Sequence, residues 1–197
     1  MNKTLLTALA AASALAIATP AAAQDVTGTV NITGSVGEKC MVTGDGPAAS
    51  SFTTTVALGE LSQADGTMRD DLATSFDAGG TGGSAMDFRV VCTTATPEIT
   101  VDADPIVADS VTSPPSGYAN TIDYVAHVQF DLVASGTQTV DNDTQGGATV
   151  EPLTDRLATG ADNVHITATG FTTGTDDEIL MADDYTGIIN ITIAPAA

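Results

Sequence analysis

The sequence has no tryptophan, two cysteines and only five lysine and arginine residues among its 197 residues. Against 25 aspartate and glutamate residues, so few cations give a formal net charge of −20. A chain of this charge lacks the basic footprint that nucleic acid or an anionic membrane surface requires. After residue 23, no segment approaches the roughly 18 apolar residues of a membrane-spanning helix. Helical segments between strands are also missing, which excludes a parallel α/β architecture and favours an all-β chain.

The first 23 residues are typical of a secretory signal peptide. Lys3 is followed by an apolar run from Leu5 to Ile17 and then by Ala21-Ala22-Ala23, which forms an A-x-A cleavage site. We therefore expect an exported mature chain that begins at Gln24. Removal of Lys3 leaves four cations against 25 acidic residues, so the mature net charge is 4 − 25 = −21. Strong like charge of this kind keeps an exported protein soluble and limits indiscriminate association.

Two cysteines in an exported chain predict one disulfide, Cys40–Cys92. On the chain-entropy model, closing a loop of this length is worth about 4 kcal/mol. Two unpaired buried thiols are the alternative. A metal site is disfavoured, because neither cysteine has a His or Cys neighbour at ligand spacing.

The segment that follows the signal peptide, residues 24–37, has the alternation of a strand with one apolar face. Thr, Asn and Ser occupy its odd positions, and its even positions carry Val26, Gly28, Val30, Ile32 and Gly34. A half-apolar strand at a chain terminus is a hazard unless a sheet edge is available to it. Our central hypothesis is that this edge belongs to another copy of the protein. The alternative is that the segment forms the first strand of its own sandwich.

Further alternating segments are spread along the rest of the chain. The strongest is Ile122 to Leu132, which we expect to be a central core strand, and weaker ones are Phe52 to Leu61, Val164 to Ala168 and Tyr185 to Ile193. Met86 to Thr94 is predicted to form a hairpin with a strand that begins at Ile99, whereas Ser62 to Ser84 is predicted to be a loop or a pair of short edge strands. Short strands separated by Gly, Pro and Asp turns predict an all-β sandwich with Greek-key connections.

Two features carry weaker functional signals. The turn from Asp141 to Gly147 has oxygens at positions one, three and five and a glycine at six, as in a calcium loop, but Pro152 stands where the bidentate glutamate belongs. His127 and His165 each fall on the polar side of a strand. Their order in the chain is compatible with a Ser-His-Asp site, but no Gly-x-Ser-x-Gly or other nucleophile turn accompanies them, so surface histidines are the better interpretation.

Three stretches resemble the subunits of chaperone–usher pili, including the branch described as spore coat protein U-like. They are GTVNITGSVGEKCMV at residues 28–42, FRVVCTTATPEITVDAD at 88–104 and DYTGIINITI at 184–193. The first is similar to the family's alternating segment before the first cysteine, the second to its second-cysteine strand and the third to its closing Tyr-x-Gly strand. The resemblance covers both ends of the mature chain and its middle.

The resemblance implies an immunoglobulin-like sandwich at residues 38–197 that lacks one strand, which residues 24–37 of the next copy supply. Donor residues would be Val26, Gly28, Val30, Ile32 and Gly34, and the acceptor groove would be lined by Tyr185, Ile189, Ile191 and Ile193. Its partners would be copies of itself in a cell-surface fimbria, with a periplasmic chaperone and an outer-membrane usher. We expect no catalytic residue, metal or other cofactor. The alternative function is a monomeric extracellular β-sandwich that binds carbohydrate or calcium.

Overall fold

The computed structural model describes residues 29–43, 48–80, 86–134, 136–175 and 177–195. The chain divides into two parts, residues 1–35 and residues 36–197. The predicted signal peptide and the predicted donor positions Val26 and Gly28 lie outside the described residues. No helix of the described residues is long and apolar enough to cross a membrane.

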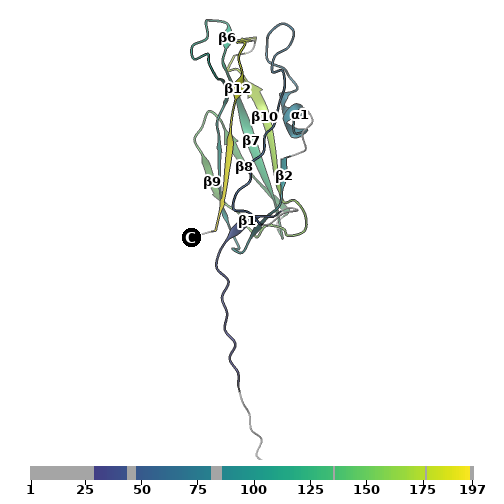
Figure 1. The fold of residues 1–197 in the computed structure, drawn as a ribbon, viewed down its shortest axis with the longest axis vertical. Coiled ribbons are helices and arrows are strands. Elements are labelled where there is room, and N and C mark those ends of the chain that lie inside the picture. Colours follow the sequence, from purple (N-terminus) through teal and green to yellow (C-terminus); the bar gives the residue numbers. More distant parts are fainter. Residues whose placement is uncertain (1–28, 44–47, 81–85, 135, 176, 196–197) are drawn as a thin grey trace, which may run out of the picture. The chain divides into compact units, whose positions relative to one another are not determined.

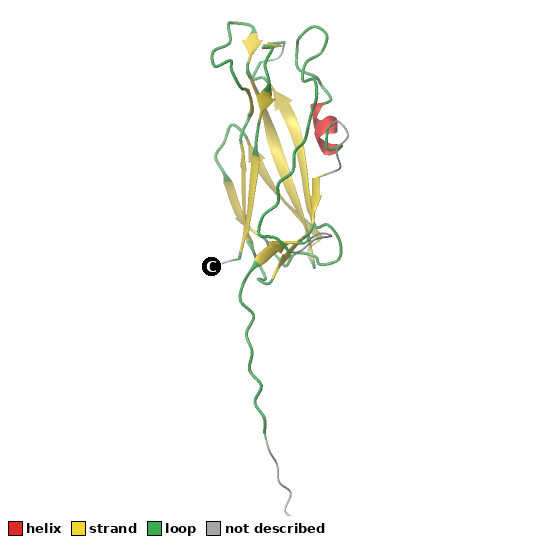
Figure 2. Cartoon of the chain, viewed as in Figure 1, coloured by secondary structure: helices red, strands yellow, loops and turns green. Residues whose placement is uncertain are grey.

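The regular secondary structure of the second part is almost entirely strand, joined by long loops (Figures 1 and 2). A single six-residue helix, α1, spans Leu72–Asp77 of the described chain. The strands are β1 (Cys40–Val42), β2 (Met86–Phe88), β3 (Val90–Cys92), β4 (Glu98–Ala103), β5 (Ile106–Ala108), β6 (Tyr118–Ala119), β7 (Thr121–Leu132), β8 (Gly136–Asp143), β9 (Thr149–Pro152), β10 (Val164–Thr172), β11 (Ile179–Leu180), β12 (Tyr185–Thr186) and β13 (Ile189–Ala194).

Two sheets form the body of the sandwich. The larger has the order β12-β5-β7-β10-β2, with β8 also paired to β7, and the smaller has the order β13-β4-β9. Side chains from both sheets share one core, in which Ile99 and Val101 of β4 pack with Val128 and Phe130 of β7 and with Val164 of β10. Two short pairs, β1–β3 and β11–β6, lie outside these sheets. The predicted all-β sandwich is therefore confirmed.

The predicted central strand is confirmed as β7. Its side chains alternate without a break, because every second residue from Ile122 to Leu132 is buried and the residues between them are half-buried. It pairs antiparallel with β10 on one side and with β5 and β8 on the other. β10 begins at Val164 as predicted and runs four residues beyond the predicted Ala168.

The predicted hairpin between Met86–Thr94 and the strand at Ile99 is wrong. The first segment breaks at Arg89 into β2, which pairs with β10, and β3, which pairs with β1. β4 instead lies between β9 and β13 in the other sheet. Proximity in sequence suggested the pairing, whereas β4 buries one face, with Ile99, Val101 and Ala103, and pairs with strands that lie far along the chain.

Three other predicted segments differ from the structure. Residues 62–84 contain α1, whose Leu72 and Phe76 point into the core one helical turn apart. Residues 52–61 form no strand; the segment is held at Ala57 by an isolated bridge to Gly80. The Asp141–Gly147 turn begins later than predicted, since β8 continues to Asp143.

The predicted closing strand from Tyr185 to Ile193 is two strands. β12 pairs with β5 in the larger sheet and β13 pairs with β4 in the smaller one. The change of sheet occurs at Gly187, where an added Cβ would lie 2.9 Å from Cγ1 of Ile106. A larger residue at this position would collide with Ile106, so the glycine allows the chain to cross between the sheets.

Candidate functional site

The site begins with the edge of the smaller sheet. β13 pairs with β4 through six residues, and among the described strands it has no neighbour on its other side. Its inward side chains, Ile189, Ile191 and Ile193, are only half-buried. Their partners across the ladder, Ala103, Val101 and Ile99, are buried. The apolar interior is thus covered over β4 and open beside β13.

A groove runs along the open side of β13. Its larger section, of about 990 Å³, lies between the segment 52–62 on one side and residues 185–191 on the other. A smaller section of about 320 Å³ continues it to Ile193 and Cys40. The two sections share Phe52, Ile189, Asn190 and Ile191, so they form one continuous channel.

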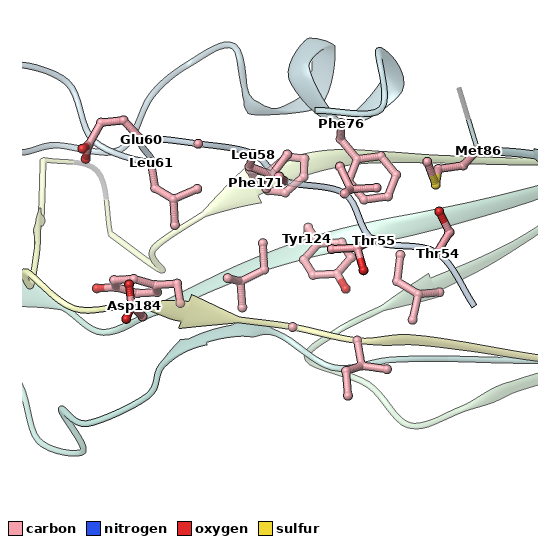
Figure 3. Close-up of a pocket in the computed structure, with 18 of the residues that line it drawn as sticks. Thr54, Thr55, Leu58, Glu60, Leu61, Phe76, Met86, Tyr124, Phe171 and Asp184 are labelled. Atoms are coloured by element: carbon pink, nitrogen blue, oxygen red, sulfur yellow. The ribbon is translucent and has the colours of Figure 1, made fainter. Parts of the chain in front are cut away.

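The floor of the groove is apolar and aromatic. Figure 3 shows Tyr124 between the two walls, with Phe76, Phe171 and Met86 pointing into the same space. The rings of Tyr124 and Phe171 stack with centroids 5.4 Å apart. The hydroxyl of Tyr124 donates a hydrogen bond to the backbone carbonyl of Asp104 at 3.0 Å. Burial raises the pKa of Tyr124 to about 12.

The wall opposite β13 is the extended segment 52–62. Its apolar side chains Phe52, Val56 and Leu58 pack against the core from one side, while the threonines between Phe52 and Val56 are exposed. Sequence reasoning missed this wall because the segment's alternation resembled that of a paired strand. The two walls together present two extended backbones, between which a further strand can be accommodated.

Acidic groups stand at one end of the groove. Glu60, Asp183 and Asp184 line the larger section near Tyr185. The side chain of Asp183 accepts hydrogen bonds from the backbone N–H groups of Ser110 and Val111 at 2.7 and 2.9 Å. These bonds lower the pKa of Asp183, the bond from Ser110 contributing most.

The predicted acceptor residues are brought together by the fold. Ile189 and Ile191 line both sections, Tyr185 lines the larger one and Ile193 the smaller one. Although Tyr185 belongs to a different sheet, it faces the same channel. The sequence did not indicate the floor residues Tyr124 and Phe171, whose alternation was typical of an ordinary core strand.

The predicted donor residues that the structure describes are exposed. Val30 and Ile32 are 85% and 92% exposed, and Val36 is 79% exposed. Gly34 has no heavy atom within 4 Å of the place where a Cβ would stand, among the atoms compared. The first strand of the described chain begins only at Cys40. Residues 29–36 therefore offer apolar side chains without a partner strand in the described chain, whereas Gly37 and Lys39 are already hydrogen-bonded to Thr93.

The predicted disulfide is confirmed, and it lies at one end of the groove. Cys40 of β1 is bonded to Cys92 of β3, directly opposite it in the ladder. Cys40 and Ile193 both line the smaller section of the groove. The N-terminal segment is thus joined to the sandwich at the Ile193 end.

The carboxylates of the calcium-like turn take part in hydrogen bonds within the protein. Oδ1 of Asp141 lies 2.7 Å from Nδ1 of His127, and Oδ1 of Asp143 accepts a bond from the N–H of Gln145. Asn142 is 2% exposed, and its amide bonds to the backbone of Ala103 and Gly147 and to Thr149. Across the described residues, no three His, Cys, Asp or Glu side chains are placed to hold a metal ion.

Both histidines lie in cross-strand hydrogen-bond networks on the outer face of the larger sheet. His127 also places Nε2 2.6 Å from the hydroxyl of Thr169, and His165 contacts Asp87 at 2.7 Å and Asp131 at 3.4 Å. These contacts join neighbouring strands. Both rings are partly exposed, with 27% and 32% of their side-chain surfaces accessible.

No protein-family model, curated protein or solved structure matches this chain. The groove, the open edge of β13 and the residues that line the groove are therefore the features that bear on function.

Proposed function

We propose that this protein is an exported structural subunit that polymerises into a cell-surface fimbria by donor-strand exchange. The observation that carries the proposal is the apolar groove beside the unpaired edge of β13. A groove of this kind accepts an extended segment through backbone hydrogen bonds to the strand edge and side chains in the channel. The occupant is residues 24–37 of a second copy.

The length and pattern of the N-terminal segment support this occupant. Residues 185–193 present one wall of the groove over nine positions, and the apolar positions 26–34 also span nine. At about 3.3 Å per residue, each is about 30 Å long. Burying three large side chains, Val26, Val30 and Ile32, is worth about 1.5–3 kcal/mol each. Several kcal/mol of association free energy are thus available before backbone hydrogen bonds are counted.

The direction of the donor follows from where the extension joins the sandwich. Each extension joins its own sandwich at Cys40, which lies at the Ile193 end of the groove. In a head-to-tail filament the next copy must then approach from the Tyr185 end, so its donor runs antiparallel to β13. If positions 26–34 align with residues 185–193, this direction would set Gly34 opposite Tyr185 and Ile32 opposite Gly187, so that small residues meet large ones. A joint between two different surfaces does not close on itself and produces a filament.

The alternative of a carbohydrate- or calcium-binding module has less support. Carbohydrate recognition favours exposed aromatic faces, but among the described aromatic side chains Tyr118 alone is classed as exposed, at 39%. The calcium-like turn uses Asp141 and Asp143 for internal hydrogen bonds. No chemistry beyond the disulfide is proposed, and the proposed partners are copies of the chain itself, with a periplasmic chaperone and an outer-membrane usher as the partners that the resemblance implies.

Size-exclusion chromatography of the mature chain, with and without residues 24–36, tests the proposal. The full chain should form concentration-dependent oligomers, and the truncated chain should not polymerise by itself. Added truncated chain should cap the oligomers and reduce their length, since it retains the groove but supplies no donor. A full-length chain that stays monomeric, or a truncated chain that polymerises equally well, would contradict donor-strand exchange.

A further inference from the structure

The imidazole of His165 lies between two carboxylates that come from neighbouring strands. On β10, its Nδ1 is 2.7 Å from Oδ1 of Asp87 on β2, and its Nε2 is 3.4 Å from Oδ2 of Asp131 on β7. With 32% of its side chain exposed, the ring exchanges protons with solvent. A single side chain therefore links three adjacent strands of the larger sheet.

β2 is the strand that depends most on this link. It has three residues, stands at the end of the sheet order, and pairs with β10 alone among the described strands. Asp87 faces outward, whereas its neighbours Met86 and Phe88 face the interior. Met86 lines the groove, and the ring of Phe88 lies 4.2 Å from that of Phe52, which lines both sections of the groove. Asp87, which contacts His165 on the outer face, and Met86, which lines the groove, thus lie on the same short strand.

The charges around His165 are of one sign. Asp87 and Asp131 are its charged partners, while Gln129, directly opposite on β7, is neutral. α1 also packs against β10, but its Leu72 and Phe76 enter the apolar clusters. On β7, His127 contacts Asp141 and Thr169. Asp123 accepts bonds from Thr144 and Gln145, and Tyr124 donates to the carbonyl of Asp104. Arg89, which lies between β2 and β3, donates to the carbonyl of Thr159.

The hydrogen bond that the His165 ring donates to Asp87 is the largest cause that raises the pKa of His165 above 6.5, and desolvation opposes it. A group whose folded-state pKa is raised gives its full stabilisation below the unfolded value, about 6.5. The stabilisation is lost as the pH rises through the higher folded-state value. In the neutral form, the ring no longer provides the positive charge that Asp87 and Asp131 share.

We propose that the imidazolium of His165 clamps the edge strand β2 onto β10 and β7, so that Met86 in the floor of the groove, and Phe88 behind Phe52, are held more firmly in mildly acidic medium than above neutral pH. The clamp acts within a single subunit. It therefore does not require the groove to be filled by a second copy.

Thermal unfolding of the full mature chain, kept dilute so that it is monomeric, tests the clamp. Between about pH 6 and pH 8.5, the wild-type Tm should fall by about 2–4 °C more than that of His165→Gln. Hydrogen exchange of residues 86–92 should be compared between the two proteins separately at each pH. At pH 6 it should be faster in His165→Gln than in the wild type, and at pH 8.5 the two rates should be equal. Equal pH slopes of Tm in the two proteins would overturn the proposal.

Two further variants keep the test specific. His127→Gln removes the other histidine of the same sheet face without touching β2, and it should retain the wild-type pH dependence of β2 exchange. Asp87→Asn should lower the pKa of the His165 ring, which NMR follows through the imidazole protons. An unchanged ring pKa in Asp87→Asn would contradict the clamp. All of these measurements use monomers, so their failure would leave donor-strand exchange unaffected.

Discussion

Ile191 and Val101 face each other across the β13–β4 ladder, yet Val101 is fully buried and Ile191 is half-buried. Val101 lies on the central strand β4, whereas β13 has no described neighbour on its other side. Their difference locates the missing cover beside β13, where the groove runs. The monomer thus leaves part of its core accessible, and the proposed donor strand supplies the cover.

Matched isoleucine truncations should measure this difference. Ile99→Ala removes fully buried methyl groups and should destabilise the monomer by about 2–5 kcal/mol. Ile191→Ala removes half-buried groups and should cost less than half as much in the monomer, while it weakens assembly. Urea unfolding of monomers, together with the concentration at which oligomers form, checks both expectations. Equal destabilisation of the monomer would mean that the core beside β13 is already closed.

Charge introduced on the apolar face of the donor should block assembly. Ile32→Asp would bury a carboxylate in the groove, so it should weaken association by at least about tenfold, equivalent to about 1.4 kcal/mol. Thr33→Asp adds the same charge on the opposite face of the segment and is the matched control. Ile32 is 92% exposed, so the variant's monomer should unfold at the wild-type temperature. Sedimentation velocity of the two variants distinguishes them, and equal loss of assembly would contradict the assigned register.

The buried amide of Asn142 connects the two sheets. Its Oδ1 accepts a hydrogen bond from the N–H of Ala103 on β4 at 2.8 Å, and its Nδ2 donates to Gly147 and Thr149. Asn142→Ala should destabilise the monomer by about 2–4 kcal/mol, because buried backbone partners lose their bonds. The exposed Asn190→Ala on β13 should change stability by no more than about 0.5 kcal/mol. Equilibrium unfolding of both variants tests the difference.

Tyr124 should titrate only in strongly alkaline solution. Its pKa is raised to about 12 by burial, above its ordinary value of 10.0, since the apolar floor of the groove disfavours the phenolate. The protonated Tyr124 contributes its full share to the free energy of unfolding below about pH 10, and this contribution is lost as the pH rises toward 12. Ultraviolet absorbance of the phenolate follows the titration, and Tyr124→Phe identifies its contribution. A Tyr124 signal that titrates near pH 10 would show a solvated ring.

The sequence predicted the elements whose signal is local. The strict alternation from Ile122 to Leu132 indicated β7, and two cysteines in a chain expected to be exported indicated the disulfide. The sheet partners of β4 were not predictable in this way, since they come from residues about 50 and 90 positions later in the chain. α1 has only six residues and no side-chain cap, so its sequence carries little helical signal.

The groove itself could be predicted only in part. The inward isoleucines of β13 follow a period of two, which any edge or central strand would share. Whether a neighbour covers them depends on segment 52–62, whose alternation does not reveal that it lacks a ladder. The aromatic floor arises where β7 and β10 pass beneath the opening, an arrangement set by the whole fold.

Cryo-electron microscopy of the assembled mature chain tests donor-strand exchange most directly. The account predicts a filament in which residues 26–34 of one subunit lie antiparallel to β13 of the next, with Val30 and Ile32 buried against Tyr124 and Phe171 or their immediate neighbours in the groove. A filament whose grooves are empty and whose subunits meet through another surface would contradict it.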